Sequence, residues 1–191
     1  LSMMLVVMPL FAADPLGNAV SSEPQPRWHL TAEGVATEWT IPGTALPHSD
    51  FIEQGGRRAG QKVWYAVNAA GQLKLERHVV WPSLRVFPND THGSLIAHYG
   101  AEAEPNISVD GVPAAPFQVS RVLLDGTLTI EGRMGAIAVR RVTFPAMKAF
   151  AAVDRWILTN AGQRPAIVSV SALSLHSERK SPYGLNLMDV S

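Results

Sequence analysis

Two runs of strand-forming residues joined by Asp125-Gly126 constrain the fold of this chain more than any other feature. Residues 117–124 and 127–131 are rich in aliphatic and β-branched side chains. An Asp-Gly pair between such runs accepts the positive φ angles of a tight turn, so the segment predicts a β-hairpin. A third strand is predicted over residues 136–144, which continue the same alternation.

A second hairpin is predicted before this one. Residues 62–67 and 73–79 each alternate apolar with polar side chains. The segment between them contains Asn68 and Gly71, and both residue types tolerate the backbone of a tight reversal. In residues 73–79, aliphatic side chains fall on one face and polar side chains on the other, as expected for a half-buried strand.

Shorter strands are predicted towards both ends of the chain. Residues 153–159 and 167–175 form a third pair, with a turn over residues 160–165. The second member of this pair alternates apolar residues with serine, which indicates one buried and one solvated face. Two short β-like runs occupy residues 28–31 and 35–41.

The sequence offers almost nothing to an α-helix. The best helical candidate, residues 146–154, is short and directly follows Pro145. Fourteen prolines and fifteen glycines supply many reversals, and 191 residues suffice for one domain with a core. These features predict an all-β fold: an antiparallel β-sandwich, supersandwich-like, with about nine or ten strands and few or no helices.

Charge and composition exclude several functional classes. Sixteen basic and sixteen acidic residues give a formal net charge of zero, so the chain has no basic field for nucleic acid. The absence of cysteine excludes disulfides, zinc–thiolate sites and a cysteine nucleophile. No phosphate-binding loop and no G-x-G-x-x-G motif is present, so no cofactor is predicted.

The N-terminal residues predict export. Residues 1–13 form an apolar run that ends in two alanines, which is typical of the core and cleavage end of a truncated secretory signal peptide. The run is too short to span a bilayer. Residues 14–27 then predict a linker, residues 28–176 the sandwich domain, and residues 177–191 the start of a further linker. The predicted location is periplasmic or extracellular.

Candidate catalytic groups are sparse. Residues 42–60 contain several glycines and prolines and are predicted to be irregular. This segment holds His48, Asp50 and Glu53. Paired carboxylates are the catalytic groups of glycosidases, but a local pair in one loop is more often a turn-forming aspartate beside a solvated glutamate.

A metal site is a second hypothesis. His48 with Asp50, and Asp90 with His92, are two His/Asp pairs that together have the ligand types of a divalent metal. Asp and His in loops rich in glycine and proline are more often turn formers. Arg85 and His92 have no such structural explanation, which makes them candidates for contacts with a sugar or a partner domain.

Aromatic side chains offer a third hypothesis. Trp64 has the opposite phase to Val63 and Tyr65, so it is predicted to be exposed or to face a partner, whereas Trp81 and Trp156 are predicted to lie in the core. A pyranose presents an apolar C–H face that stacks on an aromatic ring. An exposed tryptophan is therefore a candidate sugar-binding residue.

Several segments resemble a known family. They are HSDFIEQGG (48–56), LKLERHVVWP (73–82), LRVFPNDTHGSL (84–95) and DRWILTNAGQRPAIVSV (154–170). They look like the N-terminal β-supersandwich region of bacterial six-hairpin glycosidases of the α-L-rhamnosidase-like type. The resemblance covers roughly residues 28–176.

The resemblance implies a non-catalytic role. In that family an (α/α)6 barrel follows the sandwich and carries the catalytic acid and base, and no catalytic residue transfers to this sequence. The chain is thus expected to be the N-terminal sandwich domain of a secreted glycoside hydrolase that acts on plant or microbial polysaccharide, with the downstream barrel as its partner. The alternatives are a stand-alone carbohydrate-binding sandwich that uses Trp64 or Trp28, and a small metal-dependent hydrolase.

Overall fold

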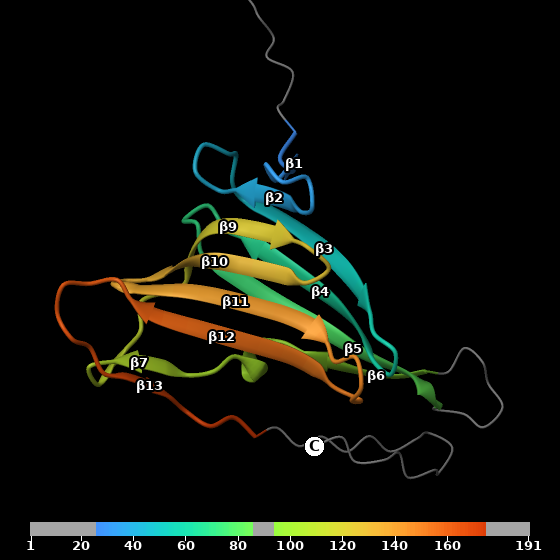
Figure 1. The fold of residues 1–191 in the computed structure, drawn as a ribbon. Helices are drawn as coiled ribbons and strands as arrows, with labels where there is room; N and C mark the ends of the chain where they lie inside the picture. Colours follow the sequence, from blue (N-terminus) through green and yellow to red (C-terminus); the bar gives the residue numbers. More distant parts are fainter. Residues whose placement is uncertain (1–25, 86–93, 175–191) are drawn as a thin grey trace, which may run out of the picture.

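The structure, a computed structural model, describes residues 26–85 and 94–174 and is an all-β sandwich, as the sequence predicts (Figure 1). All pairings between its strands are antiparallel. The helical element of the described part is a single 3₁₀ turn, η1 (Ala101–Ala103).

The larger layer is a six-stranded sheet in the order β1-β2-β9-β10-β11-β12. Its strands are β1 (His29–Leu30), β2 (Thr37–Thr40), β9 (Gln118–Leu124), β10 (Leu128–Met134), β11 (Ile137–Pro145) and β12 (Ala152–Asn160). The predicted Asp-Gly hairpin is confirmed as β9 and β10, and Gly126 has a φ of 93° in the turn between them.

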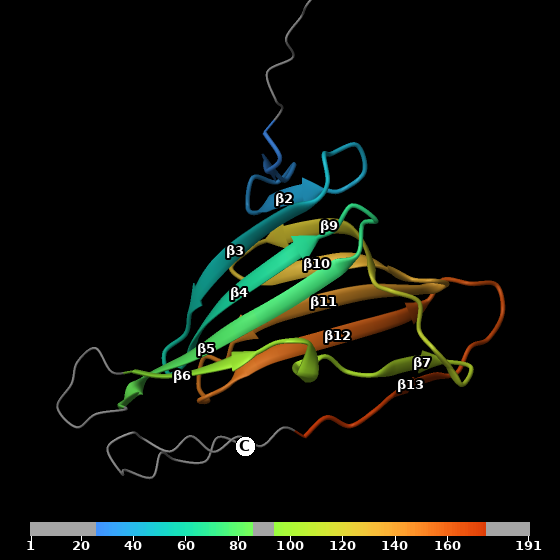
Figure 2. The same ribbon diagram turned by 180° about the vertical axis from the view of Figure 1, so that it is seen from behind.

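The second layer is a four-stranded sheet in the order β3-β4-β5-β6, which lies face to face with the larger sheet (Figures 1 and 2). Its strands are β3 (His48–Gly55), β4 (Gly60–Val67), β5 (Leu73–Arg85) and β6 (Ser94–Tyr99). The predicted hairpin over residues 62–79 is confirmed as β4 and β5. A small sheet, β13 (Val168–Val170), β7 (Ile107–Val109) and β8 (Val112–Pro113), lies beside one end of β12.

The core fills the space between the two large sheets. Strand β4 shows why, because its residues alternate strictly between buried and half-buried from Gly60 to Val67. Trp39, Val63, Val67, Val122, Leu128 and Ile130 are fully buried. Trp81 is also buried and Trp156 packs against the core, which confirms the predicted placement of both tryptophans.

Two predictions about elements are wrong. Residues 42–60 are not irregular throughout, because β3 pairs with β4 along all eight of its residues. Strand β5 runs to Arg85, but its regular pairing with β6 ends at Trp81, so no ladder bond needs the N–H that Pro82 lacks.

The predicted hairpin of residues 153–159 with 167–175 does not form. Strand β13 is short and pairs with β7 instead of β12. The Asp110 carboxylate fixes this choice, because it accepts a hydrogen bond of 2.8 Å from the Ile167 N–H while the Asp110 N–H donates to the Ile167 carbonyl. Residues 161–166 therefore bridge two sheets and do not form a hairpin turn.

Candidate functional site

The carboxylates of Asp50 and Glu53 do not converge, because they lie on opposite faces of β3. Residues three apart on a strand point to opposite sides of the sheet. His48 and Asp50 are half-buried and face the six-stranded sheet, whereas Glu53 is exposed on the outer face. The two carboxylates are therefore not positioned to flank one glycosidic bond.

Arg27 and Trp39 hold the side chain of His48 in place. The Arg27 guanidinium donates a hydrogen bond of 2.6 Å to Nε2 of His48, and the imidazole ring meets Trp39 edge-on with centroids 5.0 Å apart. Burial, and then the charge of Arg27, lower the pKa of His48, although Asp50 lies 3.8 Å away. At the neighbouring Tyr65, burial and the charge of Asp50 raise the pKa of the phenol. Around His48 the structure thus favours a neutral imidazole that accepts a bond.

The four-residue metal hypothesis rests partly on Asp90 and His92, which lie outside the described residues. The side chain of Arg85 is likewise not described. Within residues 26–85 and 94–174, no three metal-ligating side chains come together.

The outer face of the four-stranded sheet, which points away from the six-stranded sheet, carries a continuous row of rings. Phe51 on β3 lies 6.1 Å from Trp64 on β4, Trp64 lies 4.7 Å from His78 on β5, and His78 lies 4.8 Å from His98 on β6, measured between ring centroids. We call these four residues the ring ladder. It crosses all four strands, and the predicted outward orientation of Trp64 is confirmed.

Pairing registers explain the ladder. Phe51 lies directly opposite Trp64, and His78 directly opposite His98, while Trp64 reaches His78 diagonally. Phe51 is 52% exposed, which makes it one of the large apolar side chains on the surface of the described residues. The rings are adjacent but not coplanar, because Phe51 is tilted by 40° to Trp64, and the next two pairs meet edge-on at 67° and 76°.

Charged groups that cancel one another flank the ladder. Lys62 lies over the rings of Phe51 and Trp64, at 4.4 and 4.7 Å from their centroids, and its ammonium is 3.2 Å from the Glu53 carboxylate. Lys74 pairs with Glu76 at 2.7 Å. Among the described residues beside the ladder, these two lysines and two glutamates cancel in formal charge.

His78 in the centre of the ladder tends towards neutrality. Burial, then the charges of His98 and Lys62, lower the pKa of His78. A hydrogen bond from Lys74, and its charge, lower the pKa of Glu76. The lowered pKa of His78 favours an uncharged ring next to Trp64, with the charged groups Lys74 and Glu76 at the border.

A hollow lies beside Trp64. It has a volume of about 340 Å³ and is lined by Ser49, Trp64, Ala66, Lys74 and Glu76, among others. The small side chains of Ser49 and Ala66 leave this space between the tryptophan ring and the lysine. Its size falls in the range of small-molecule sites.

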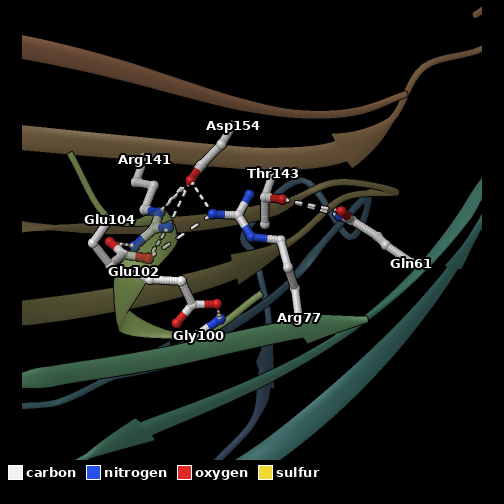
Figure 3. A network of polar contacts seen from close by, with 8 residues as sticks. All are labelled: Gln61, Arg77, Gly100, Glu102, Glu104, Arg141, Thr143 and Asp154. Carbon is white, nitrogen blue, oxygen red and sulfur yellow. Dashed lines mark hydrogen bonds and ion pairs between the residues drawn. The ribbon is translucent and has the colours of Figure 1, made fainter. Parts of the chain in front are cut away.

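A second group of polar residues lies between the two sheets (Figure 3). Arg141 on β11 donates to both oxygens of Glu104, at 2.8 and 2.7 Å, and to both oxygens of Asp154 on β12, at 3.0 and 2.6 Å. Arg77 on β5 donates to Asp154 at 2.8 Å. We call these four residues the charge cluster. It ties both sheets to the chain after η1.

The charge cluster escaped the sequence analysis, although one signal was visible. Arg77 has the phase of Leu75 and Val79, and Arg141 has the phase of Ile137 and Val139, so each arginine lies at a buried position of its strand. A charge at such a position needs a buried partner. The partners are fixed by the packing of the two sheets, which the sequence does not display.

Comparisons with protein-family models, with curated proteins and with solved structures give no match for this chain. The described part of the chain contains no helix with the length and hydrophobicity that a membrane span requires.

Proposed function

We propose that this chain is a non-catalytic β-sandwich domain that binds carbohydrate through the ring ladder. The observation that carries the proposal is the run of four adjacent rings across the outer face of the four-stranded sheet. Sugar rings stack on such a platform through their C–H faces, while their hydroxyls need donors and acceptors at its border. Lys74 and Glu76 are such border groups beside the hollow.

The chemistry of the face favours a neutral glycan. Lys62 and Lys74 are each paired with a glutamate, so neither of these lysines offers an anionic sugar an unpaired cation. The hollow next to Trp64 suits a sugar unit that stacks on the indole and bonds to the Lys74–Glu76 pair. Exposed aromatic residues that form a contiguous patch on a monomer commonly mark such a binding surface.

The resemblance to six-hairpin glycosidases supplies a setting for this activity. A sandwich that holds polysaccharide beside a catalytic barrel raises the local concentration of substrate for that barrel. The proposal includes this setting: an accessory domain of an exported glycoside hydrolase, with catalysis on another domain.

Replacing Trp64 with alanine is expected to weaken glycan binding at least tenfold, because the central ring of the platform is lost. Isothermal titration of the chain against neutral oligosaccharides, such as cello-, xylo- and rhamno-oligosaccharides, measures this effect. Leu30→Ala is the matched control, because Leu30 is 71% exposed on the other sheet and should leave affinity unchanged. An unaltered chain that binds none of these sugars at millimolar concentration would contradict the proposal, as would equal binding by the Trp64 variant.

A further inference from the structure

A cavity of about 440 Å³ opens at one edge of the sandwich, away from the ring ladder. Its lining includes residues of β5, β6 and β12. Strands β6 and β12 are the edge strands of their sheets, so no further strand of the described chain covers this side. The volume lies in the range that holds a small molecule.

Aromatic rings form the walls of this cavity. Trp81, Tyr99, Phe150 and Trp156 all line it. The walls are held in place, because Trp81 Nε1 donates a hydrogen bond of 2.8 Å to the Phe150 carbonyl and the Arg58 guanidinium packs 5.0 Å from the centroid of the Phe150 ring. Preformed aromatic walls favour a flat or ring-shaped ligand.

The polar floor of the cavity offers donors, and its acceptors are already in use. Asp154 lies there, and its carboxylate accepts bonds from both Arg77 and Arg141. Arg77 also lines the cavity, and its contacts within the described residues all run through Nη2 (Figure 3). No acceptor among the described residues bonds to its Nε or Nη1, so these two nitrogens are the donors that a ligand oxygen would meet.

The charge balance decides which acceptor fits. Arg77 and Arg141 are matched by Glu104 and Asp154, so the charge cluster is formally neutral. A carboxylate brought to Arg77 would add a third anion beside Asp154 and Glu104, at the cost of like-charge repulsion in a poorly solvated site. A carbonyl or ether oxygen would satisfy the guanidinium without that cost.

We propose that this cavity binds a neutral ring compound whose carbonyl or ether oxygen accepts hydrogen bonds from Arg77. The ring lies between the aromatic walls, and the oxygen points to the floor beside Asp154. This site is separate from the ring ladder and does not depend on the carbohydrate proposal, because the two surfaces lie on opposite faces of the four-stranded sheet.

The test compares three probes of nearly equal shape by ¹⁹F NMR: 4-fluoroacetophenone, 4-fluorobenzoate and 1-ethyl-4-fluorobenzene. They carry a neutral acceptor, an anionic acceptor and no acceptor. The ketone is expected to bind the 191-residue chain with a Kd at least tenfold lower than the other two. Failure of all three to bind at millimolar concentration overturns the proposal, and so does equal binding of the three.

A cavity-filling variant locates the bound probe. Ala152 lines the cavity on β12 in phase with Asp154, so Ala152→Phe is expected to raise the Kd of the ketone at least tenfold. Ala161→Phe, at an exposed position just after β12, is the control and should leave the Kd within twofold. Undiminished binding by a folded Ala152→Phe chain overturns the assignment. Should this variant not fold, the three-probe comparison on the unaltered chain still decides.

Discussion

Replacing Asp154 with alanine is expected to lower the free energy of unfolding by about 3–5 kcal/mol. The change removes the carboxylate shared by two arginines, of which Arg141 is 1% and Arg77 9% exposed at the side chain. Burial alone would lower the pKa of Arg141, but its bonds to Asp154 and Glu104 raise it, so the guanidinium stays charged. Two buried arginines would then share the single carboxylate of Glu104, and the unmatched positive charge cannot recover its hydration. Urea denaturation at about pH 7, followed by tryptophan fluorescence, measures the loss.

The control for this change is an exposed ion pair. Glu53 is 67% exposed and lies 3.2 Å from Lys62, so Glu53→Ala should cost less than about 1 kcal/mol. If Asp154→Ala costs no more than this control, the charge cluster does not stabilise the sandwich in the way its geometry indicates.

The same carboxylate predicts a loss of stability in acid. Burial raises the pKa of Asp154, but hydrogen bonds from Arg141 and the charges of Arg141 and Arg77 outweigh burial, so its pKa lies below the ordinary 3.8. A carboxyl whose pKa is lower in the folded state stabilises the fold above the unfolded pKa and ceases to do so as the pH falls through the folded pKa. The unaltered chain should therefore lose more stability between about pH 5 and pH 2 than Asp154→Asn does. Urea denaturation of both chains at about pH 5 and at about pH 2 measures these losses. An equal loss of unfolding free energy in the two chains would refute the prediction.

Local turn chemistry made much of the fold predictable. Asp125-Gly126 and Asn68 with Gly71 fix two hairpins within a few residues of sequence, and the structure contains both. Strand β3 escaped prediction because the adjacent Phe51 and Ile52 place one large apolar side chain on each face. Its regularity comes from pairing with β4, which is a contact between separate segments.

In the candidate site, too, one part follows from local sequence and the rest follows from strand pairing. The phase of Trp64 within its own strand sufficed to predict that it points away from the core. The other members of the ring ladder are its neighbours only through the registers of β3, β5 and β6. A shift of one residue in any register would turn the contributed side chains to the opposite face, so the ladder is a property of the assembled sheet.

Replacing Gly132 with alanine is expected to destabilise the sandwich by about 3 kcal/mol or more, because the added methyl group has no space. Gly132 is buried in β10 at the point where pairing with β9 shifts register after Glu131. A Cβ there would overlap the carbonyl oxygen of Gln118 and lie 2.7 Å from Cε2 of Phe117. Backbone and a buried ring cannot yield as the tip of a flexible side chain does. Urea denaturation measures the loss.

Gly55→Ala separates this steric effect from the general effect of glycine replacement in a strand. Gly55 is exposed in β3, and a Cβ there would meet no atom within 4 Å. Alanine reduces the freedom of the unfolded chain, so this variant should be unchanged or up to about 1 kcal/mol more stable. Equal stability changes in the two variants would mean that β9 and β10 can separate at the bulge. A large loss in Gly132→Ala alone would show that the close approach of the two backbones is what requires glycine at this position.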